Sequence, residues 1–590
     1  MLGMCAGPAV AVPPPSAAKV LFVAVDGNDA HPGTEARPFR TITRAQDVAR
    51  AWIEEMTDDI TVYLREGVYV LTEPLRFDHR DSGMGGHRVI YRSYPGERAV
   101  LSGGQRLDGW VPDGPGVYRA FAGGRRFRQL YVDGVRGIRA RHPNEPEFAR
   151  LVRWDEATRR IVVPDDTVGP WAQHQAVEMV ILKQWTQDNL RVESADGPEE
   201  DRFIVPREPD RSKAFLGHLF LRFESQSFYF ENALELLDKP GEWFLQDGTD
   251  EVLYRPREGE DLAHRAVIVP VLERLVEIAG TPADPVHDMD FRGLTFEYSG
   301  WTQPSREGFV IVQADAIFSQ TTPMGGRVPA AVHVEHAERL TLEGNLFRRL
   351  GGTALTLDRG VNDTKVIGNR VEDVSGSGIV LDGFLHPRPI DPRLPSRNTV
   401  ISNNVVQRIG LDYRSSVGIF VGYASDTIIE HNEIHDTPYT GISVGWGWTD
   451  ARTLLARNRI RWNHIYSVMT SMADGGGIYT LSYQPGTVIQ GNYIHDIVRS
   501  PWAGHAPISA LYLDEGSSGI AVLENVLERV PMGIFFHHAS RNRVVNTPGS
   551  YEERWEAEDN EIRDTPDYDP AAVKARAGLE PAYAYLRQRE

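Results

Sequence analysis

Two acidic motifs in the C-terminal half hold the residue types that cleavage of a glycosidic bond needs. Asp474 precedes three consecutive glycines, Gly475 to Gly477, and Asp514 is followed directly by Glu515. Glycines beside an acid permit either a tight turn or the close approach of a ligand. Two carboxyl groups can cleave a glycosidic bond, because one protonates the leaving oxygen while the other activates water or attacks the anomeric carbon. Asp474 and Asp514 are therefore the candidate catalytic pair, and the residues alone do not decide between Asp514 and Glu515.

The two motifs lie at the ends of a strand that recurs through the C-terminal half. Because side chains alternate along a strand, the second residue of each copy should face the core and the third should face outward. The outward column contains Phe420, Tyr479, Tyr512 and Phe535. This column predicts an aromatic ladder that is either an exposed stacking surface for sugar rings or a surface covered by a loop or another domain. The aligned copies are Ala354–Asp358, Gly378–Asp382, Gly418–Gly422, Gly441–Gly445, Gly477–Leu481, Ala510–Asp514 and Gly533–His537.

The same alignment gathers candidate substrate-binding residues around the acids. It places His537 in one column with Asp514, and it favours a turn for Asp382 beside Gly383. An extended strand would separate Asp474 from Asp514 by more than the roughly 5–9.5 Å that a glycosidase pair needs. The prediction therefore requires curvature or a shifted register near the glycines. The residues expected to line the groove are Trp446, Trp448, Tyr479, Tyr512, His537 and His538.

An asparagine recurs in one local context, each time before a short apolar pair. Repeats of this length predict a solenoid in which each unit buries its apolar face only against its neighbours. Short strands with turns in every repeat are typical of a parallel β-helix. There an inward asparagine can hydrogen-bond a turn and stack on the asparagine of the next coil, which is a structural role. The seven positions are Asn345, Asn369, Asn404, Asn432, Asn463, Asn492 and Asn525.

The chain divides into five segments on these patterns. Residues 1–18 are apolar and Pro-rich, and we interpret them as a disordered lead or the remnant of a trimmed signal. Residues 19–109 should form the N-terminal cap, with a helix within 42–56, and the first coils. Residues 110–265 lack the asparagine repeat and hold alternating strands, which predict an inserted β-sandwich-like domain. The main β-helix should occupy residues 266–548, and a partly helical tail, residues 549–590, should pack on it.

Composition restricts the partners. The 590 residues carry a net charge of −19, which disfavours nucleic acid and anionic membrane surfaces and favours a neutral glycan. The sequence has no apolar run of 18 residues, so it predicts no transmembrane helix. Its one cysteine, Cys5, allows no internal disulfide. We expect a monomer, and a secreted or periplasmic location is favoured over a cytoplasmic one.

No cofactor is predicted. The sequence lacks a His/Cys pattern for a metal site. Gly475–Gly477 lies between coils and lacks the βαβ setting that a phosphate-binding loop needs.

Several motifs together resemble glycoside hydrolase family 141, over roughly Lys19 to Arg543. The resemblance implies an all-β fold, a right-handed parallel β-helix with an inserted β-sandwich-like domain. It also implies hydrolysis of plant or algal cell-wall polysaccharide, α-L-fucosidase-like in the first place and xylanase in the second, with Asp474 and Asp514 as the catalytic acids. The motifs are Val23–Thr34, Tyr63–Tyr69, Asp81–Gly83, Tyr94–Glu97, Leu101–Gly104, Phe127–Gly134, Gly293–Phe296 through Trp301, Asp474–Tyr479 and Leu511–Glu515.

Two other functions stay open at this point. A β-helix polysaccharide lyase needs a Lys, Arg, His or Tyr base and a group that neutralises a uronate. The coils contain no lysine after Lys365, and the net acidity disfavours a uronate, but tyrosine or arginine bases remain available. The second alternative is a glycan-binding β-helix without catalytic activity.

Overall fold

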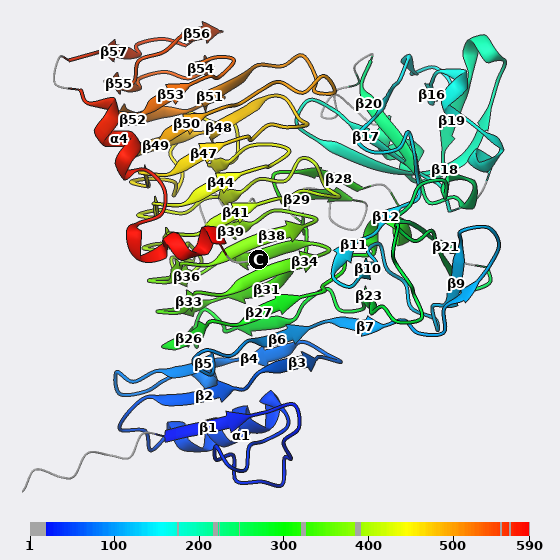
Figure 1. Ribbon diagram of the computed structural model, residues 1–590. Helices are drawn as coiled ribbons and strands as arrows, with labels where there is room; N and C mark the ends of the chain where they lie inside the picture. Colours follow the sequence, from blue (N-terminus) through cyan, green and yellow to red (C-terminus); the bar gives the residue numbers. More distant parts are fainter. Residues whose placement is uncertain are drawn as a thin grey trace, which may run out of the picture.

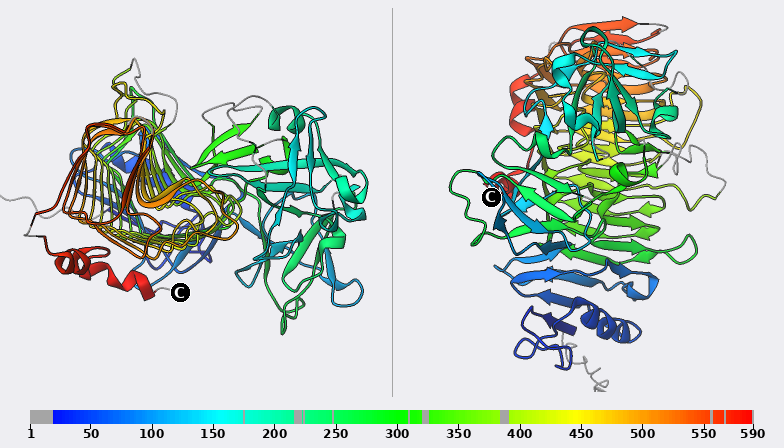
Figure 2. Two further views of the ribbon diagram at one scale, coloured as in Figure 1. Left: turned by 90° about the horizontal axis from the view of Figure 1, so that it is seen from above. Right: turned by 90° about the vertical axis from the view of Figure 1, so that its right-hand side faces the viewer.

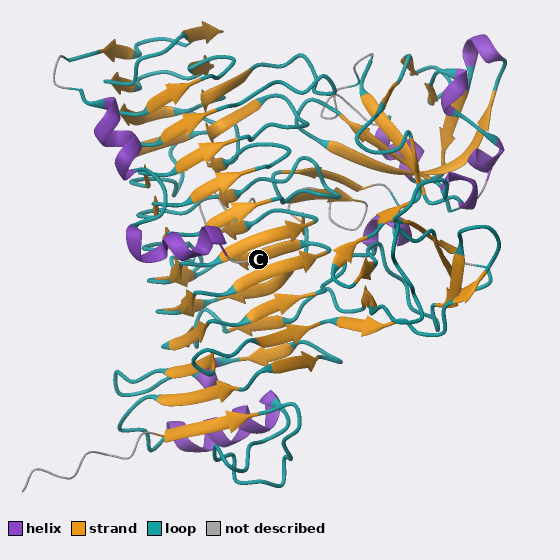
Figure 3. Ribbon diagram, viewed as in Figure 1, coloured by secondary structure: helices purple, strands orange, loops and turns teal. Residues whose placement is uncertain are grey.

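The protein is a parallel β-helix with a second, laterally attached region of mainly antiparallel strands (Figures 1 and 3). The computed structural model describes residues 19–588 except 174–175, 216–221, 223–224, 247, 309, 320–325, 384–390, 555–556 and 566–567. The segment 1–18, expected to be a disordered lead or a signal remnant, lies outside the described residues. Seen along its axis, the stacked coils form one column with the attached region beside it (Figure 2).

Three parallel sheets form the walls of the column. The first contains β1 (Lys19–Val23), β2 (Ile60–Leu64), β5 (Val89–Ser93), β26 (Met289–Arg292), β33 (Thr341–Glu343), β37 (Lys365–Ile367), β40 (Val400–Ser402), β43 (Ile428–Glu430), β46 (Arg459–Arg461), β49 (Tyr483–Gln490), β52 (Ser518–Leu523), β55 (Arg543–Val545) and β57 (Glu561–Arg563). The second, here the site sheet, contains β4 (Leu75–Phe77), β24 (Val276–Ala279), β31 (Ala330–Glu335), β35 (Thr353–Leu357), β39 (Ile379–Leu381), β42 (Ile419–Val421), β45 (Ile442–Val444), β48 (Gly475–Thr480), β51 (Ile508–Leu513), β54 (Ile534–His537) and β56 (Tyr551–Arg554). The third contains β3 (Gly67–Val70), β6 (Ala99–Ser102), β27 (Thr295–Glu297), β34 (Leu346–Leu350), β38 (Arg370–Val374), β41 (Val405–Gln407), β44 (Glu433–His435), β47 (His464–Tyr466), β50 (Tyr493–His495) and β53 (Val526–Glu528). Three short strands, β25 (Val286–His287), β32 (Ala337–Glu338) and β36 (Val361–Asn362), pair at one corner.

The register of the site sheet agrees with the alignment of the recurring strand. Ile442 pairs with Ile478, Ile478 with Leu511, and Leu511 with Ile534. The side chains of this column are at most 2% exposed, so they form part of the continuous core that the three sheets enclose. The strict alternation of side chains along each strand explains why a small first residue and one apolar column were enough to align the coils.

A ladder of buried asparagines runs along one corner of the β-helix. The side-chain oxygen of each asparagine accepts hydrogen bonds from both the backbone NH and the side-chain NH2 of the preceding one. For Asn432 and Asn463 these distances are 3.1 and 2.9 Å. The side-chain NH2 also donates to a strand carbonyl of the first sheet, as Asn432 does to Ile401 at 2.9 Å. The same pattern connects all seven predicted asparagines, each 0% exposed.

The N-terminal end of the column is covered by α1 (Ile42–Ile53), within the predicted range 42–56. The hydroxyl of Thr41 caps this helix by accepting a hydrogen bond from the NH of Arg44. Ile42, Ala45, Ala49 and Ile53 are buried on the face that packs against the first coil. The helix therefore shields the apolar end of the core, which an open solenoid would expose.

The attached region contains three sheets. One holds β7 (Gly104–Arg106), β10 (Tyr131–Val132), β11 (Val135–Arg136) and β23 (Val267–Pro270), and another holds β8 (Val111–Pro112), β9 (Tyr118–Phe121), β12 (Ile138–Arg139), β21 (Glu242–Gln246) and β22 (Glu251–Tyr254). The largest holds β13 (Arg141–His142), β14 (Ala149–Arg150), β15 (Arg153–Asp155), β16 (Arg160–Val162), β17 (Glu178–Leu182), β18 (Gln187–Asp196), β19 (Phe203–Pro206), β20 (Ser227–Glu231), β28 (Val310–Gln313), β29 (Ala316–Ser319) and β30 (Gly326–Arg327). Short helices α2 (Asp210–Ala214) and α3 (Gln303–Arg306) lie in its connections. Strands β28 to β30 lie within residues 266–548, which we expected to form the main β-helix. The largest sheet therefore combines strands of the inserted domain with strands from this later segment.

Side-chain contacts join the attached region to the coils. Gln187 donates to the carbonyl of Asp412 at 2.9 Å and accepts from the NH of Arg414 at 2.7 Å. Arg136 pairs with Asp373 at 2.7 Å, and both side chains are about 15% exposed or less. Such desolvated contacts hold the region against one side of the column.

The C-terminal segment lies along the outside of the coils (Figure 1). It contains α4 (Pro570–Arg576) and a 3-10 helix, Pro581–Gln588. The NH of Gly578 donates to Trp462 O at 2.7 Å, and Arg587 pairs with Glu433 at 2.6 Å. No helix in the part of the chain that the structure describes combines the length and apolar character of a membrane span.

Replacing one member of the asparagine ladder tests its contribution to stability. In Asn432→Ala, buried donors and acceptors on the adjacent coils lose their partners, and we expect the free energy of unfolding to fall by about 1–3 kcal/mol. Chemical denaturation measures this change. Asn398→Gly serves as the control, because Asn398 is exposed and its positive φ of 56° is one that glycine adopts without strain, and it should change stability by less than about 0.5 kcal/mol. Equal effects of the two substitutions would contradict a special role for the ladder.

Candidate active site

Asp474 and Asp514 are joined through two tyrosines of neighbouring coils. Tyr512, on β51, donates a hydrogen bond to Oδ1 of Asp474 at 2.5 Å. Tyr479, on β48, donates a short hydrogen bond to Oδ2 of Asp514. The two tyrosines pair in the sheet register, and their ring centroids are 5.2 Å apart. Each acid therefore bonds to the tyrosine on the strand of the other acid, so the four side chains form one cluster.

The tyrosine contacts bring the two acids into one cluster, although β48 keeps a regular register with β51 from Gly475 to Thr480. In the sheet register Tyr512 pairs with Tyr479, which is five residues after Asp474. In an extended strand these five residues would place Asp474 roughly 16 Å from the tyrosine pair, which is more than the side chains of Asp474 and Tyr512 can span. Asp474 takes a positive φ of 59°, which turns the chain where β48 begins. A Cβ on Gly476 would lie 2.3 Å from Ser509 O, and one on Gly477 would lie 2.6 Å from Ile494 Cγ2. The glycines are therefore required because the backbone packs closely against adjacent coils.

Asp514 has the hydrogen-bonding pattern of an ionised carboxylate. Its Oδ1 lies 2.5 Å from Nδ1 of His537, and its Oδ2 accepts from Tyr479. An ionised carboxylate only accepts hydrogen bonds, so Nδ1 of His537 must carry a proton. Burial lowers the pKa of His537, but the hydrogen bond and negative charge of Asp514 outweigh burial and raise it. The carboxylate is thus held between two donors, with the residue only 5% exposed.

Asp474 is in a different electrostatic environment. The residue is half-buried, and burial raises the pKa of its carboxyl group to about 7. The negative charge of Asp514 also raises this pKa, whereas the hydrogen bond from Tyr512 lowers it. Asp474 therefore retains a proton near neutral pH, beside an acid that lies in a hydrogen-bonded, ionised arrangement. Two carboxyl groups whose environments differ in this way can take the two roles of acid and base.

The attached region holds the segment that precedes Asp474. Gln184, in the turn between β17 and β18, accepts a hydrogen bond from the NH of Ala473 at 2.8 Å through its carbonyl oxygen. Its side-chain oxygen accepts from the NH of Ala506 at 2.9 Å. Gly504 packs on this side chain so closely that a Cβ would lie 2.1 Å from Gln184 Oε1. The turn from the attached region thus fixes both backbone segments that lead into β48 and β51.

The aromatic ladder is covered, which corrects the expectation that Tyr479 and Tyr512 line a groove as exposed platforms. Tyr479 is 6% exposed and Tyr512 only 1% exposed, and Phe420 and Phe535 are equally buried. Their faces pack within the core, and the hydroxyl groups of the two tyrosines contact the acids. A sugar ring cannot stack on a face that protein atoms already cover. Of the two alternatives for this column, the covered surface is correct.

The remaining predicted residues differ in exposure. Trp446 is 6% exposed, whereas Trp448 is 40% exposed, and their ring centroids are 4.8 Å apart. His538 is exposed and its ring lies 4.8 Å from that of His537. Glu515 is half-buried directly after Asp514. Among these, Trp448 and His538 are the side chains that a soluble sugar can reach most readily.

One residue of the cluster was missed in the sequence. Tyr439 is 3% exposed and donates a hydrogen bond at 2.7 Å to the backbone carbonyl of Asp474. The alignment that pairs Ile442 with Ile478 also puts Tyr439 at the level of Gly475. The signal was therefore present, three residues before the aligned strand, in a turn that the strand pattern did not cover.

A few acidic clusters could supply metal ligands, and one overlaps the candidate pair. Ligand atoms of Asp514, Glu515 and His537 lie within 4.8 Å of one another. However, both oxygens of Asp514 already accept hydrogen bonds, and a calcium ion needs six to eight oxygen ligands. Nδ1 of His537 donates to Asp514 in this arrangement, so that nitrogen is not available to a cation. The donor set therefore fits a hydrogen-bonded carboxylate better than a metal centre.

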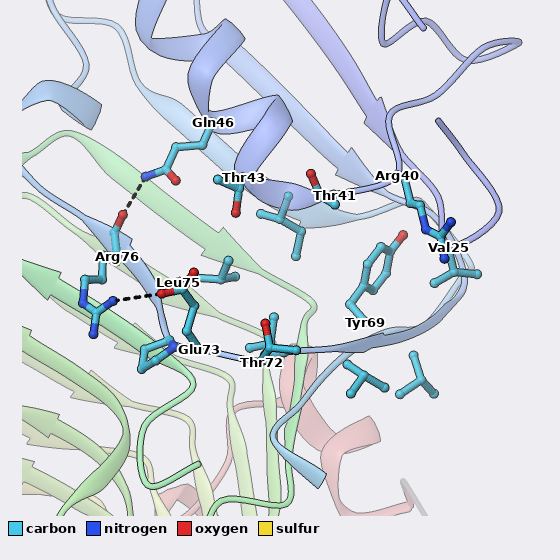
Figure 4. A pocket seen from close by; sticks show the side chains of 15 residues that line it. Val25, Arg40, Thr41, Thr43, Gln46, Tyr69, Thr72, Glu73, Leu75 and Arg76 are labelled. Carbon is cyan, nitrogen blue, oxygen red and sulfur yellow. Dashed lines mark hydrogen bonds and ion pairs between the residues drawn. The ribbon is translucent and has the colours of Figure 1, made fainter. Parts of the chain in front are cut away.

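A hollow lies at the other end of the molecule, beside α1. Its volume is about 560 Å³, and Gln46, Tyr69, Glu73 and Arg76 are on its walls (Figure 4). The amide of Gln46 donates to Arg76 O at 2.7 Å, and Arg76 pairs with Glu73 at 3.6 Å. Its charged side chains are two arginines, Arg40 and Arg76, and one glutamate, Glu73, so it contains no pair of carboxyl groups. It does not resemble a site for acid–base chemistry.

Comparisons with known proteins agree with this architecture. A family model described as the GH141 insertion domain matches residues 108–257, and one described as a right-handed β-helix region matches residues 393–547. A solved structure described as a glycoside hydrolase is 30% identical, with 96% of this chain and 100% of that chain covered and a TM-score of 0.86. The predicted right-handed parallel β-helix with an inserted domain is confirmed.

Two further proteins are similar over different lengths. The structure of XylC in complex with xylose is 13% identical, covering 93% of this chain and 86% of that chain, with a TM-score of 0.49. The uncharacterized protein YwoF of Bacillus subtilis (strain 168) is 36% identical over 83 residues, which are 14% of this chain and 15% of that protein. The chain thus matches less than a sixth of the length of that curated relative.

The raised pKa of Asp474 predicts a pH-dependent effect of its replacement on stability. Between the ordinary value of 3.8 and about 7, the unfolded chain loses this proton while the folded chain keeps it, so the contribution of Asp474 to stability falls as pH rises. Asp474→Asn removes this loss. Calorimetry measures the melting temperature of the variant minus that of the original protein. This difference should be larger at pH 8 than at pH 4. The same substitution at the exposed Asp363 controls for the removal of one negative charge, and a difference that does not change with pH at Asp474 would contradict the assignment.

Proposed function

The chain belongs to glycoside hydrolase family 141, and we propose that Asp474 and Asp514 are the carboxyl groups with which it cleaves the glycosidic bond. Membership of this family makes the protein an enzyme that hydrolyses carbohydrate. The lyase and the non-catalytic glycan-binding protein, both open from the sequence, are therefore set aside. The observation that carries the proposal is the crossed pair of hydrogen bonds, Tyr512 to Asp474 and Tyr479 to Asp514.

Asp474 is the proposed general acid. It keeps a proton near neutral pH, because burial and the charge of Asp514 raise its pKa to about 7. Tyr512 bonds to Oδ1, which leaves Oδ2 to present the proton to the oxygen of the leaving group. The hydrogen bond from Tyr439 to the backbone carbonyl of Asp474 holds the turn in place. A fixed, protonated carboxyl group is what departure of an alkoxide-like leaving group requires.

Asp514 is the proposed base or nucleophile. Tyr479 and His537 orient its two oxygens and stabilise its negative charge without donating a proton permanently. In this role it activates a water molecule or attacks the anomeric carbon, and Glu515 is the reserve for the same role. His537 and Tyr479 are positioning residues here, since they act through the carboxylate.

The proposed substrate is plant or algal cell-wall polysaccharide or a fragment of it, with an α-L-fucosyl linkage in the first place and a xylan in the second. The resemblance to family 141 supports both. The exposed Trp448 packed on Trp446 offers an apolar aromatic face at the edge of the cluster, which suits a sugar ring. Product analysis over fucosylated glycans, xylans and pectin fragments decides between the substrates. Release of fucose supports the first, xylo-oligosaccharides support the second, and hydrolysis of none of these glycans rejects this substrate class.

Removing either acid tests the catalytic pair. We expect Asp474→Asn and Asp514→Asn each to lower kcat by about 10²–10⁴-fold on the substrate that the product analysis identifies, because each loses one step of acid–base or nucleophilic catalysis. Asp363→Asn is the control for the chemical change and should keep its activity. Circular dichroism should show that all three variants remain folded. If both variants at the proposed pair turn over near the normal rate, the pair is not catalytic.

The pH profile tests which acid donates the proton. Because Asp474 must be protonated, kcat/KM should fall as pH rises through about 7. The hydrogen bond from Tyr512 lowers the pKa of Asp474, so Tyr512→Phe should move this alkaline limb to higher pH. Steady-state kinetics between pH 5 and 9 measure the shift. A limb that stays at the same pH or moves to lower pH in Tyr512→Phe would exclude Asp474 as the group responsible.

A further inference from the structure

We propose that a cavity between the inserted domain and α3 is a second carbohydrate site, which binds the anionic group of a uronate or sulfated sugar residue. The proposal rests on membership of a carbohydrate-hydrolysing family and does not depend on the assignment of the catalytic pair. It concerns residues that take no part in the chemistry described above.

Four arginines give this cavity its character. It has a volume of about 300 Å³, and Arg126, Arg128, Arg139 and Arg306 are on its walls. The described residues that line it include no aspartate or glutamate. The protein as a whole has a net charge of −19, whereas the charged side chains on this wall are all arginines. A concave surface lined by one sign of charge attracts a ligand of the opposite sign.

The two inner arginines are held rigidly from behind. Arg128 lies 2.6 Å from Glu178 and 2.9 Å from Glu231, and Arg139 contacts the same two carboxylates at 2.9 and 2.5 Å. These side chains are at most 9% exposed. The Nε atoms of both arginines have no hydrogen-bond partner among the described residues. The charges of this group balance, so it supplies fixed geometry rather than excess charge.

The two arginines nearer to solvent are also paired with carboxylates, but these ion pairs are exposed to water. The side chain of Arg126 is 47% exposed and pairs with Asp250 at 2.7 Å, and that of Arg306 is 66% exposed and pairs with Glu307 at 2.8 Å. Exposed ion pairs of this kind contribute little to stability. The two guanidinium groups can therefore turn from these partners to a ligand. Arginine suits this role because its planar group binds a carboxylate or a sulfate through two parallel hydrogen bonds.

The rest of the wall suits a sugar ring. Thr302 and Ser305 contribute hydroxyl groups, and Phe127 and Leu245 contribute apolar surface. The side-chain oxygen of Asn232, a residue 7% exposed, has no hydrogen-bond partner among the described residues. Mixed apolar and polar walls with a few convergent charges are typical of ligand sites, and 300 Å³ is at the lower end of their range of volumes. The cavity thus fits one sugar residue rather than a chain.

The cavity is remote from the catalytic pair. The loop that carries α3 leads from β27 to β31, and five strand steps separate β31 from β48 in the site sheet. At the spacing of neighbouring strands this is about 24 Å along the axis. A polysaccharide held here could be retained by the enzyme without occupying the site of cleavage.

Binding of defined sugars to the full-length protein tests the proposal. Isothermal titration calorimetry would use D-glucuronate, a sulfated monosaccharide and neutral D-glucose, with the double variant Arg126→Gln/Arg306→Gln. We expect at least one anionic sugar to bind, and its Kd to rise at least tenfold in the double variant. Arg457→Gln is the control. Like the two tested arginines, Arg457 has an exposed side chain, 60% exposed, and is paired with a carboxylate, that of Asp426, at 2.6 Å. It should bind as the original protein does.

The outcomes separate the possibilities. Binding of glucuronate identifies the carboxylate as the anion, and binding of the sulfated sugar alone identifies the sulfate. Binding of neither, equal binding of glucose, or unchanged binding by the double variant would overturn the proposal. Melting temperatures verify that the variants are folded. Turnover of a small substrate should be unchanged in the double variant, so that failure of this site and failure of the catalytic assignment can be distinguished.

Discussion

Stacking of buried asparagines along one corner is the interaction on which the rest of this structure depends. Each asparagine links the coil before it to the coil after it, and each also bonds a strand carbonyl of the first sheet. These amide groups are removed from water, and leaving them without hydrogen-bond partners would cost free energy. The asparagines of neighbouring coils must therefore stay aligned along the axis. The ladder therefore sets the axial register of the sheets. The site sheet inherits that register, which is why Tyr479 and Tyr512 lie side by side.

The site is built by breaking the regularity at one point of an otherwise repetitive wall. The chain turns at Asp474, which takes a positive φ directly before β48, and the glycines that follow let the backbone pack closely on the adjacent coils. The tyrosine of each strand then reaches the acid of the other. A side chain at Gly476 or Gly477 would clash with atoms of the adjacent coils. The inserted domain completes the arrangement, because Gln184 holds the segments that precede both strands.

Burial of the aromatic column has an electrostatic consequence. Tyr439, Tyr479 and Tyr512 remove the acids from bulk water while each keeps a hydroxyl group directed at an acid motif. Burial raises the pKa of Asp474, whereas His537 supplies a donor to Asp514. The same covered surface thus favours a neutral carboxyl group on one side and an ionised one on the other. This division is what a hydrolase that cleaves glycosidic bonds needs from two chemically identical side chains.

The sequence by itself determined the repeat and much of the register. Asparagine spacing and the alternation of side chains predicted the β-helix, the ladder and the pairing of Ile478 with Leu511, because these follow from local periodicities of the chain. It also singled out Asp474 and Asp514. It did not determine whether the outward tyrosines were exposed or covered, nor how two acids at opposite strand ends could meet. Only the tertiary structure decided these points, since they depend on the turn at Asp474, on close packing at the glycines after it, and on contacts with Gln184, which is almost 300 residues earlier in the chain.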